Sequence, residues 1–146
     1  MRIKRNAVWA MLLVSIAGGS YTAVTSAAEQ AGMTPAGSIA WEPFFGGPLQ
    51  IAKLWGDRDQ GAYGMLLKMP AGFEAGSHAH TAAYHAINVQ GTWLHTMDGQ
   101  TKELPVGSFV TQPGMQFHND ACKGPDDCIL FIQQDAKGDF IPAEKK

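Results

Sequence analysis

The sequence has few cysteines, little clustered positive charge and no long uninterrupted apolar run. Lysine and arginine occur singly or in short groups, so the basic stripe of a nucleic-acid-binding protein is absent, and nucleic acid is not an expected partner. The only cysteines are Cys122 and Cys128, so no cysteine follows the N-terminal apolar run as lipid attachment would require. With 146 residues the chain has room for about one domain, and any site must be built inside a single core.

Residues 1–28 have the three-part layout of a secretory signal peptide. Basic residues at positions 2, 4 and 5 precede the apolar run 7–19, and small residues follow from position 25. A membrane anchor would need roughly 18 consecutive apolar residues, whereas serine and glycine interrupt this run. We predict cleavage after Ala27 or Ala28, export to the periplasm or the medium, and a single mature domain, 29–146, without membrane association. The mature net charge is −5, since eight of the eleven basic residues remain against thirteen acidic ones.

The spacing of the two cysteines favours a disulfide. The segment between Cys122 and Cys128 contains Gly124-Pro125 and two aspartates, a turn composition that folds the chain back on itself. In an exported protein the two thiols are expected to oxidise. Zinc ligation usually leaves about two to four residues between cysteines, and a redox Cys-x-x-Cys pair leaves two, so neither alternative matches this spacing.

Short strand-length segments separated by turn residues predict an all-β fold. No window outside the N-terminal apolar run shows a sustained helical period of apolar residues. The expected strands are 50–55, 62–69, 85–89, 92–97, 108–112, 115–118 and 128–133. Asp98-Gly99 predicts a tight hairpin that pairs 92–97 with 101–104. So many short strands at turn spacing indicate a β-sandwich or barrel.

Histidines are concentrated in one stretch of the chain. Three of the five lie between His78 and His85, and no carboxylate occurs within that stretch. Side chains alternate across a strand, so His78 and His80 project to the same side, with α-carbons roughly 6.5 to 7 Å apart. They can therefore converge on one metal ion. His118 follows a separate turn and is a further candidate ligand.

Two motifs resemble those of the cupin superfamily. They are Gly72-x5-His78-x-His80 with a later Gly91, and Gly107-x5-Pro113-x4-His118. Their order and the short stretch between them, residues 92–106, are similar to the family pattern. The resemblance implies a single-domain double-stranded β-helix, also called a jelly-roll barrel, with a divalent transition metal held by the motif histidines.

Further traits resemble a group of small exported bacterial cupins of unknown function. These traits are Pro70–Phe73 before the histidines, the run His80–His85 and the loop Cys122–Cys128. The group is similar to the zinc-binding cupin half of a bacterial anti-sigma factor and to the three-histidine iron dioxygenase that cleaves acetylacetone. The resemblance implies a metal-binding barrel that takes a small-molecule ligand or substrate, and it allows a homodimer.

The sequence departs from the cupin pattern at the glutamate that is normally the fourth ligand. That position is Tyr84 or His85, depending on whether three or four residues intervene. Strand alternation groups His85 with Ile87 and Val89, and the apolar face of a strand should be interior. It groups Tyr84 with Asn88. We therefore predict that His85 lies inside, as a fourth ligand or as an acid–base group beside the metal, and that Tyr84 lies outside.

The expected metal site is all-nitrogen. The candidate ligands are His78, His80, His85 and His118. An uncharged imidazole set favours Zn, Fe, Ni or Cu over Mg or Ca. His95 matches no ligand position, and we expect a structural, pocket-lining or proton-shuttle role for it. The residues expected to supply an apolar wall, most of them through packing in the core, are Trp93, Met97, Phe109, Met115, Phe117 and Phe131.

Two classes of function remain open. The first is an exported metal-dependent enzyme, of the dioxygenase or hydrolase type, that acts on a small carbonyl or enol-like molecule. Its candidate catalytic residues are His85, Tyr84 and His95, because neither motif offers a carboxylate. The second is a non-catalytic sensor or carrier module, in which a fourth histidine closes the coordination sphere.

Overall fold

The computed structural model describes residues 32–144, and the predicted signal peptide with its cleavage point lies outside them. Within the described range no helix is long and apolar enough to cross a membrane. The described elements are the 3₁₀ helix η1 (Ala36–Ser38) and the strands β1 (Glu42–Pro43), β2 (Gln50–Gly56), β3 (Tyr63–Met69), β4 (His78–Ala79), β5 (Tyr84–Gln90), β6 (Trp93–Met97), β7 (Gln100–Leu104), β8 (Phe109–Gln112), β9 (His118–Cys122), β10 (Cys128–Gln134) and β11 (Ile141–Pro142).

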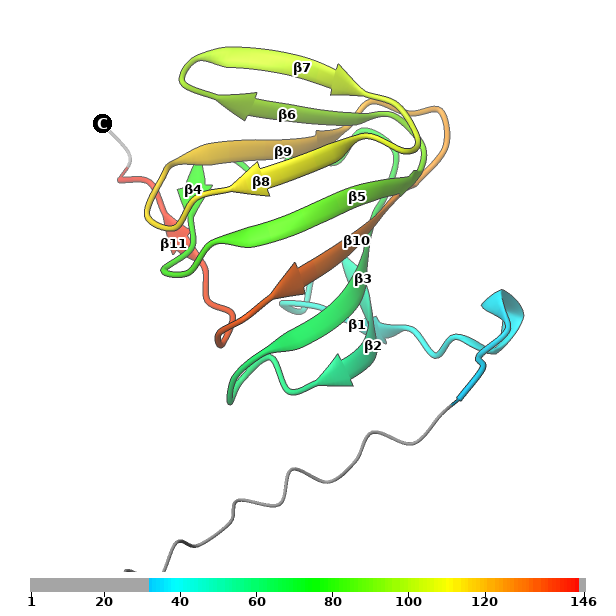
Figure 1. The fold of residues 1–146 in the computed structure, drawn as a ribbon. Coiled ribbons are helices and arrows are strands. Elements are labelled where there is room, and N and C mark those ends of the chain that lie inside the picture. The colour runs from blue at the N-terminus through cyan, green and yellow to red at the C-terminus, as the bar shows by residue number, and fades with distance from the viewer. Residues whose placement is uncertain (1–31, 145–146) are drawn as a thin grey trace, which may run out of the picture. The chain divides into compact units, whose positions relative to one another are not determined.

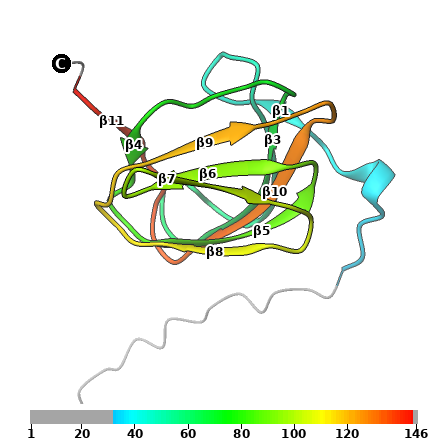
Figure 2. The ribbon, with the colours of Figure 1, turned by 90° about the horizontal axis from the view of Figure 1, so that it is seen from above.

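The strands form two antiparallel sheets (Figure 1). One sheet has the order β1-β2-β3-β10-β5-β8, and the other has the order β11-β4-β9-β6-β7. The chain passes repeatedly from one sheet to the other, for example from β8 to β9 and from β9 to β10, which is the winding of a double-stranded β-helix. Seen from above, the strands wind around a common interior (Figure 2). The all-β class predicted from the turn spacing is confirmed.

Most predicted strands are observed within one residue at each end. The predicted hairpin is present, because β6 pairs with β7 across Asp98 and Gly99. Both turn residues have positive φ, 53° and 74°, as this tight turn requires. The prediction for 115–118 is wrong, since β9 begins only at His118 and runs to Cys122. The short strands β1, β4 and β11 were not predicted.

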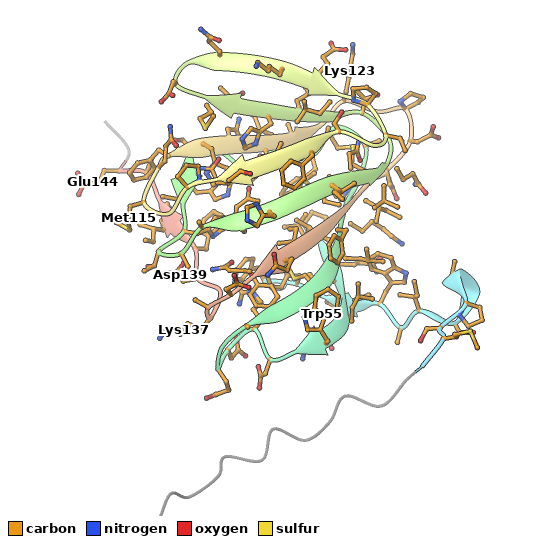
Figure 3. The ribbon with its side chains drawn as sticks, in the orientation of Figure 1. Trp55, Met115, Lys123, Lys137, Asp139 and Glu144 are labelled. Atoms are coloured by element: carbon orange, nitrogen blue, oxygen red, sulfur yellow. A yellow bond between two sulfur atoms is a disulfide. The ribbon has the colours of Figure 1, made fainter. Side chains whose placement is uncertain are left out.

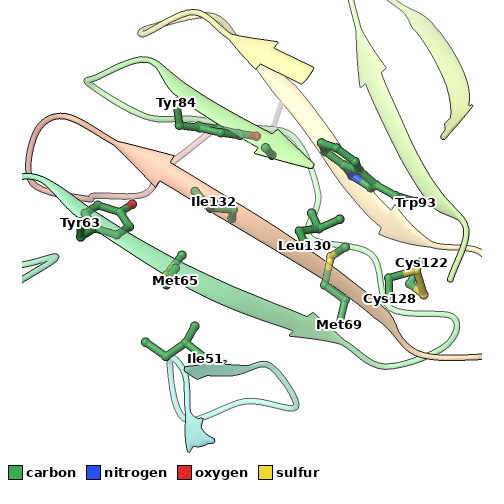
Figure 4. Packing of buried hydrophobic residues seen from close by; sticks show 11 residues of the cluster. Ile51, Tyr63, Met65, Met69, Tyr84, Trp93, Cys122, Cys128, Leu130 and Ile132 are labelled. Carbon is green, nitrogen blue, oxygen red and sulfur yellow. A yellow bond between two sulfur atoms is a disulfide. The ribbon is translucent and has the colours of Figure 1, made fainter. Parts of the chain in front are cut away.

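The core lies between the two sheets and draws side chains from both (Figure 4). Its buried members are Ile51, Tyr63, Met65, Met69, Tyr84, Ala86, Trp93, Cys122, Cys128, Leu130 and Ile132. The largest is Trp93 of β6, which is fully buried. Strands β3 and β10 lie side by side over their whole length, from Met69 opposite Cys128 to Tyr63 opposite Gln134. Their inward side chains therefore form one continuous apolar surface.

The predicted disulfide joins Cys122 to Cys128. It links the end of β9 to the start of β10, and thus one sheet to the other, and both cysteines are buried. Gly91 lies against this bridge with a φ of 76°, and a Cβ there would be 2.7 Å from the carbonyl oxygen of Asp127 and 3.0 Å from Cys128 Sγ. A side chain at position 91 would therefore clash with the bridged loop.

The two faces of β5 are the reverse of the predicted ones. The buried side chains are Tyr84, Ala86 and Asn88, and the exposed ones are His85, Ile87 and Val89. The expectation that the apolar face must be the interior one is wrong for this strand.

The outer face of the six-stranded sheet is also apolar, which explains the reversal. Ile87 lies directly opposite Phe131 of β10 and Phe109 of β8. The ring of Phe131 in turn packs 5.7 Å from that of Trp55, a residue labelled in Figure 3. On the inner face, the side-chain NH2 group of Asn88 donates to the carbonyl oxygens of Gly91 and Leu104.

Removal of the disulfide should destabilise the fold. In a Cys122→Ser, Cys128→Ser double variant the unfolded chain regains the freedom of a short loop, whose closure is worth about 2 kcal/mol on chain-entropy grounds. Urea unfolding of the two proteins, with metal content held equal, should show a correspondingly lower free energy of unfolding for the variant. An unchanged transition midpoint would contradict a structural role for the bridge.

Candidate metal centre

Three histidine side chains meet in the interior. His78 lies in β4, His80 follows that strand, and His118 opens β9 directly opposite His78. One ring nitrogen from each histidine lies within 4.8 Å of the other two. His78 and His118 are buried, whereas His80 is half-buried. The structure thus brings together three of the four histidines predicted as ligands, in an arrangement consistent with a metal site.

Backbone carbonyl groups determine which nitrogen of each ring points inward. Each ring directs its Nδ1 at a carbonyl oxygen, which can only accept, so Nδ1 carries the proton and Nε2 carries the lone pair. The Nδ1–oxygen pairs are His78 with Gly76 at 2.8 Å, His80 with Asp139 at 2.6 Å and His118 with Gln116 at 3.2 Å. Outer hydrogen bonds of this kind orient histidine ligands in metalloproteins.

The chemistry of this donor set fits a transition metal. Burial lowers the pKa of His78 and of His80 below the ordinary histidine value, although hydrogen bonds to backbone carbonyls oppose the shift. The neutral imidazole is the form that binds metal. Neutral nitrogen donors suit Zn, Fe, Ni or Cu better than Mg or Ca.

A buried carboxylate adjoins the three histidines. Asp120 Oδ2 lies 3.3 Å from His118 Nε2 and 3.8 Å from His78 Nε2. Its Oδ1 accepts hydrogen bonds from Trp93 Nε1 and from His95 Nδ1, each 2.8 Å long. Burial raises the pKa of the Asp120 carboxyl, but the neighbouring His118 and His95 side chains outweigh burial and hold that pKa below the usual value. Asp120 is therefore ionised beside the cluster.

Asp120 was absent from the predicted site, although the sequence contains a signal for it. It follows His118 by two positions on β9, and strand alternation gives both side chains the same face. His95 lies on β6 directly opposite Asp120 in the register. The structure thus places His95 as the partner that holds Asp120, while a proton-shuttle role for it stays a prediction.

Tyr84 occupies an interior position at the cluster, and the prediction that it faces outward is wrong. Its hydroxyl lies 3.2 Å from His118 Nε2. Burial, reinforced by the charge of Asp120, raises the pKa of Tyr84 well above its ordinary value. The phenol therefore keeps its proton and acts as a hydrogen-bond donor. Of the two candidates for the glutamate position of the cupin pattern, Tyr84 is thus the one that faces the cluster.

His85 projects away from the three histidines, which contradicts its predicted place inside the barrel. The side chain is on the exposed face of β5. Its ring stacks on Phe109, with centroids 5.7 Å apart, and its Nδ1 lies 3.2 Å from Thr111 Oγ1. Because β5 turns its other face inward, neither ligation nor acid–base chemistry at the cluster is open to His85.

A cavity of about 350 Å³ adjoins the cluster and is lined at that end by His78, His80, Tyr84 and Asp120. Its apolar lining consists of Phe44, Phe45, Leu49, Met65, Leu67, Met69, Phe73, Leu130, Ile132 and Phe140, together with smaller side chains. The predicted wall is wrong in its membership, since Phe109, Met115 and Phe117 are 60%, 61% and 47% exposed. The wall comes instead from β3, β10 and the loops that contain Phe44, Phe45, Phe73 and Phe140.

Alanine substitutions should separate the cluster from His85. The His78→Ala, His80→Ala and His118→Ala variants should each lose stoichiometric zinc, because two imidazoles bind far more weakly than three. His85→Ala is the matched control and should retain wild-type zinc content, as measured by elemental analysis of folded protein. Zinc loss in the control, or full zinc in any of the other three, would contradict this assignment.

Comparisons with known proteins agree with this architecture. The polyketide cyclase RemF from Streptomyces resistomycificus is similar with a TM-score of 0.68 and 12% identity, over 80% of this chain and 88% of that chain. An RmlC-like cupin from Ralstonia eutropha is similar with a TM-score of 0.62 and 24% identity, over 80% of this chain and 76% of that chain. The complex of Rhodobacter sphaeroides SigE with the anti-sigma ChrR is similar with a TM-score of 0.57 and 21% identity, over 69% of this chain and 52% of that chain. At these identities the likeness shows the fold, and the predicted cupin resemblance is confirmed.

The family comparison covers most of the described chain. No curated protein matches this sequence. Residues 49–145 match the family described as a domain of unknown function, DUF4437. The matched segment contains both cupin-like motifs, the three clustered histidines and the disulfide. The chain is therefore a member of the DUF4437 family with the all-β cupin fold.

Proposed function

We propose that this protein is an exported metal-dependent enzyme, of the dioxygenase or hydrolase type, that acts on a small carbonyl or enol-like molecule. The observation that carries the proposal is that His78 and His80 line a cavity of about 350 Å³ together with Tyr84 and Asp120. A site that opens on such a cavity has room for a substrate beside its ligands, which is the arrangement of catalytic rather than structural metal sites.

The three clustered histidines would hold one divalent transition metal, Zn, Fe, Ni or Cu, through their Nε2 atoms. When bound, such an ion supplies a Lewis acid and, in its redox-active forms, a centre for oxygen chemistry. The neutral histidines leave the positive charge of the ion undiminished, and the carboxylate of Asp120 is the negative group placed to balance part of it.

Tyr84 and Asp120 have different tasks in this proposal. In the structure the protonated Tyr84 hydroxyl donates to His118 Nε2. When that nitrogen holds a metal ion, the hydroxyl would instead donate a hydrogen bond that orients a substrate oxygen. Asp120 accepts hydrogen bonds from Trp93 and His95 through Oδ1, and its Oδ2 faces the histidines. The lowered pKa of this carboxyl makes it a weak base, so in the proposal it balances charge rather than removing a proton. The apolar wall excludes water and takes the hydrocarbon part of the substrate.

Export is part of the proposal and is supported by two observations. The N-terminal residues have the composition of a signal peptide. Cys122 and Cys128 form a disulfide, and disulfides persist mainly in oxidising compartments such as the bacterial periplasm or the medium.

A non-catalytic metal carrier or sensor is the second candidate, and the position of Asp120 favours it. Its Oδ2 lies close to two of the three Nε2 atoms and would serve as a fourth protein ligand after a small displacement. Four protein ligands would close the coordination sphere, as in structural metal sites. The number of non-protein ligands on the metal therefore discriminates between the two candidates.

Turnover of two probes tests the enzyme proposal. The mature protein would be depleted of metal, reloaded with Fe(II) or Zn(II), and supplied with acetylacetone under air or with p-nitrophenyl acetate. We expect oxygen uptake by the iron form or ester hydrolysis by the zinc form, with loss to the metal-free background in His80→Ala and retention in His85→Ala. Absence of both activities, together with four protein ligands and no bound water by X-ray absorption, would contradict an enzyme and favour the carrier.

A further inference from the structure

A positively charged side chain lines the same cavity as the histidine cluster. Arg58 lies in the turn between β2 and β3 and is one of the residues around the cavity. Its side chain is only 15% exposed, which is unusual for an arginine. Neither cupin motif contains it, and nothing in the histidine site requires a cation there.

The surrounding residues hold the guanidinium group in place. Its central carbon lies 4.9 Å from the ring centre of Phe44 and 5.5 Å from that of Phe45, distances at which a cation is attracted to an aromatic face. At Gly138, a Cβ would lie 2.8 Å from Arg58 Nε and 2.9 Å from the hydroxyl oxygen of Tyr63. The absence of a side chain at position 138 therefore leaves the space that the guanidinium uses.

The charge of Arg58 is poorly compensated by the protein. Its Nε is buried and has no hydrogen-bond partner among the described residues. The one ion pair that Arg58 makes within 4 Å in the described range is with Asp59 at 3.5 Å, and that carboxylate is 79% exposed, so the pair contributes little.

Asp139 is the other acidic group close enough to influence Arg58, but its carboxylate is already engaged. It lies between β10 and β11, as labelled in Figure 3, and lines the cavity. Both of its oxygens accept hydrogen bonds from Thr81, one from the backbone N–H and one from the hydroxyl. These bonds, more than the nearby charge of Arg58, lower the pKa of Asp139. Arg58 therefore remains available to an anion.

We propose that the ligand of this cavity is a small organic monocarboxylate, with an apolar body and a carbonyl or enol oxygen, whose carboxylate binds Arg58. The inference rests on the proposed function, since it places the oxygen at the histidine cluster. A single guanidinium matches one carboxylate through two parallel hydrogen bonds. A doubly charged phosphate would keep excess negative charge in a cavity that already contains Asp139 and Asp120.

The test uses matched probes that differ in charge. Phenylpyruvate carries a carboxylate, an enolisable carbonyl and an apolar body. In 1-phenylbutane-2,3-dione a methyl group replaces one carboxylate oxygen and the charge is lost. Benzylphosphonate supplies the doubly charged alternative. Dissociation constants would be measured by titration calorimetry on the zinc-loaded mature protein and on its Arg58→Met, Arg58→Lys and Lys53→Met variants.

The wild-type protein should bind phenylpyruvate at least roughly tenfold more tightly than the dione, as expected for a charge-assisted pair of hydrogen bonds. Arg58→Met should weaken phenylpyruvate binding by roughly tenfold to a hundredfold and leave dione binding unchanged. Arg58→Lys should give an intermediate dissociation constant for phenylpyruvate, because lysine keeps the charge but lacks the paired N–H donors of the guanidinium. Lys53→Met removes the same charge from an exposed side chain on β2 and should behave as the wild type.

Four results would overturn the inference: no binding of phenylpyruvate to the wild-type protein, equal binding of phenylpyruvate and the dione, tighter binding of benzylphosphonate, or phenylpyruvate binding that is unchanged in Arg58→Met. Zinc content measured on every sample separates the inference from the proposed function. One zinc per chain without an effect of Arg58 overturns the inference alone. A preference for the carboxylate that depends on Arg58, in wild-type protein that takes up no zinc, overturns the proposed function alone.

Discussion

The buried carboxylate of Asp120, set beside imidazole nitrogens, is the interaction on which the site depends. Its Oδ2 lies 3.3 Å from His118 Nε2 and 3.8 Å from His78 Nε2. A carboxylate and imidazole lone pairs repel one another at these distances unless a proton or a metal ion lies between them, and the low polarity of the interior strengthens that repulsion. The donors to Asp120 from Trp93 and His95 reach only Oδ1, so Oδ2 is left for a cation.

The two sheets supply different parts of this arrangement. The five-stranded sheet contributes the polar residues, with His78 on β4, His118 and Asp120 on β9, and His95 on β6. The six-stranded sheet contributes most of the apolar wall through β3 and β10. The disulfide ties β9 to β10, so it fixes the edge where these two halves of the interior meet. Most of the polar cluster thus comes from one sheet, and most of the apolar wall of the cavity comes from the other.

Parts of the fold and of the site could be predicted from the sequence because they depend on local rules. The Asp98-Gly99 turn, the same-side projection of His78 and His80, and the cysteine loop each follow from a few adjacent residues. The orientation of β5 could not be predicted in this way. Both faces of its sheet are apolar, and Asn88 donates to two carbonyl oxygens in the interior. The polarity of the side chains therefore does not distinguish the outer face of β5 from the inner one.

The remaining site residues depend on packing between distant segments. Arg58 sits in a turn with no motif around it, and its burial follows from the rings of Phe44 and Phe45 and from the space at Gly138. The side of β9 on which Asp120 lies could be predicted, since it follows His118 by two positions on the same strand. Its burial could not be predicted, because it depends on hydrogen bonds from Trp93 and His95 on another strand.

The zinc affinity of an Asp120→Asn variant tests the central claim most directly, with Asp126→Asn at an exposed position as the control. The amide keeps the shape of the carboxylate and can still accept from Trp93 and His95, but it removes the negative charge that faces the histidines. If a cation belongs between Asp120 and the imidazoles, zinc affinity measured by chelator competition falls roughly tenfold to a hundredfold. The metal-free variant should be at least as stable to urea as the metal-free wild type, because the repulsion is relieved. Equal zinc affinity in the two proteins would contradict the account.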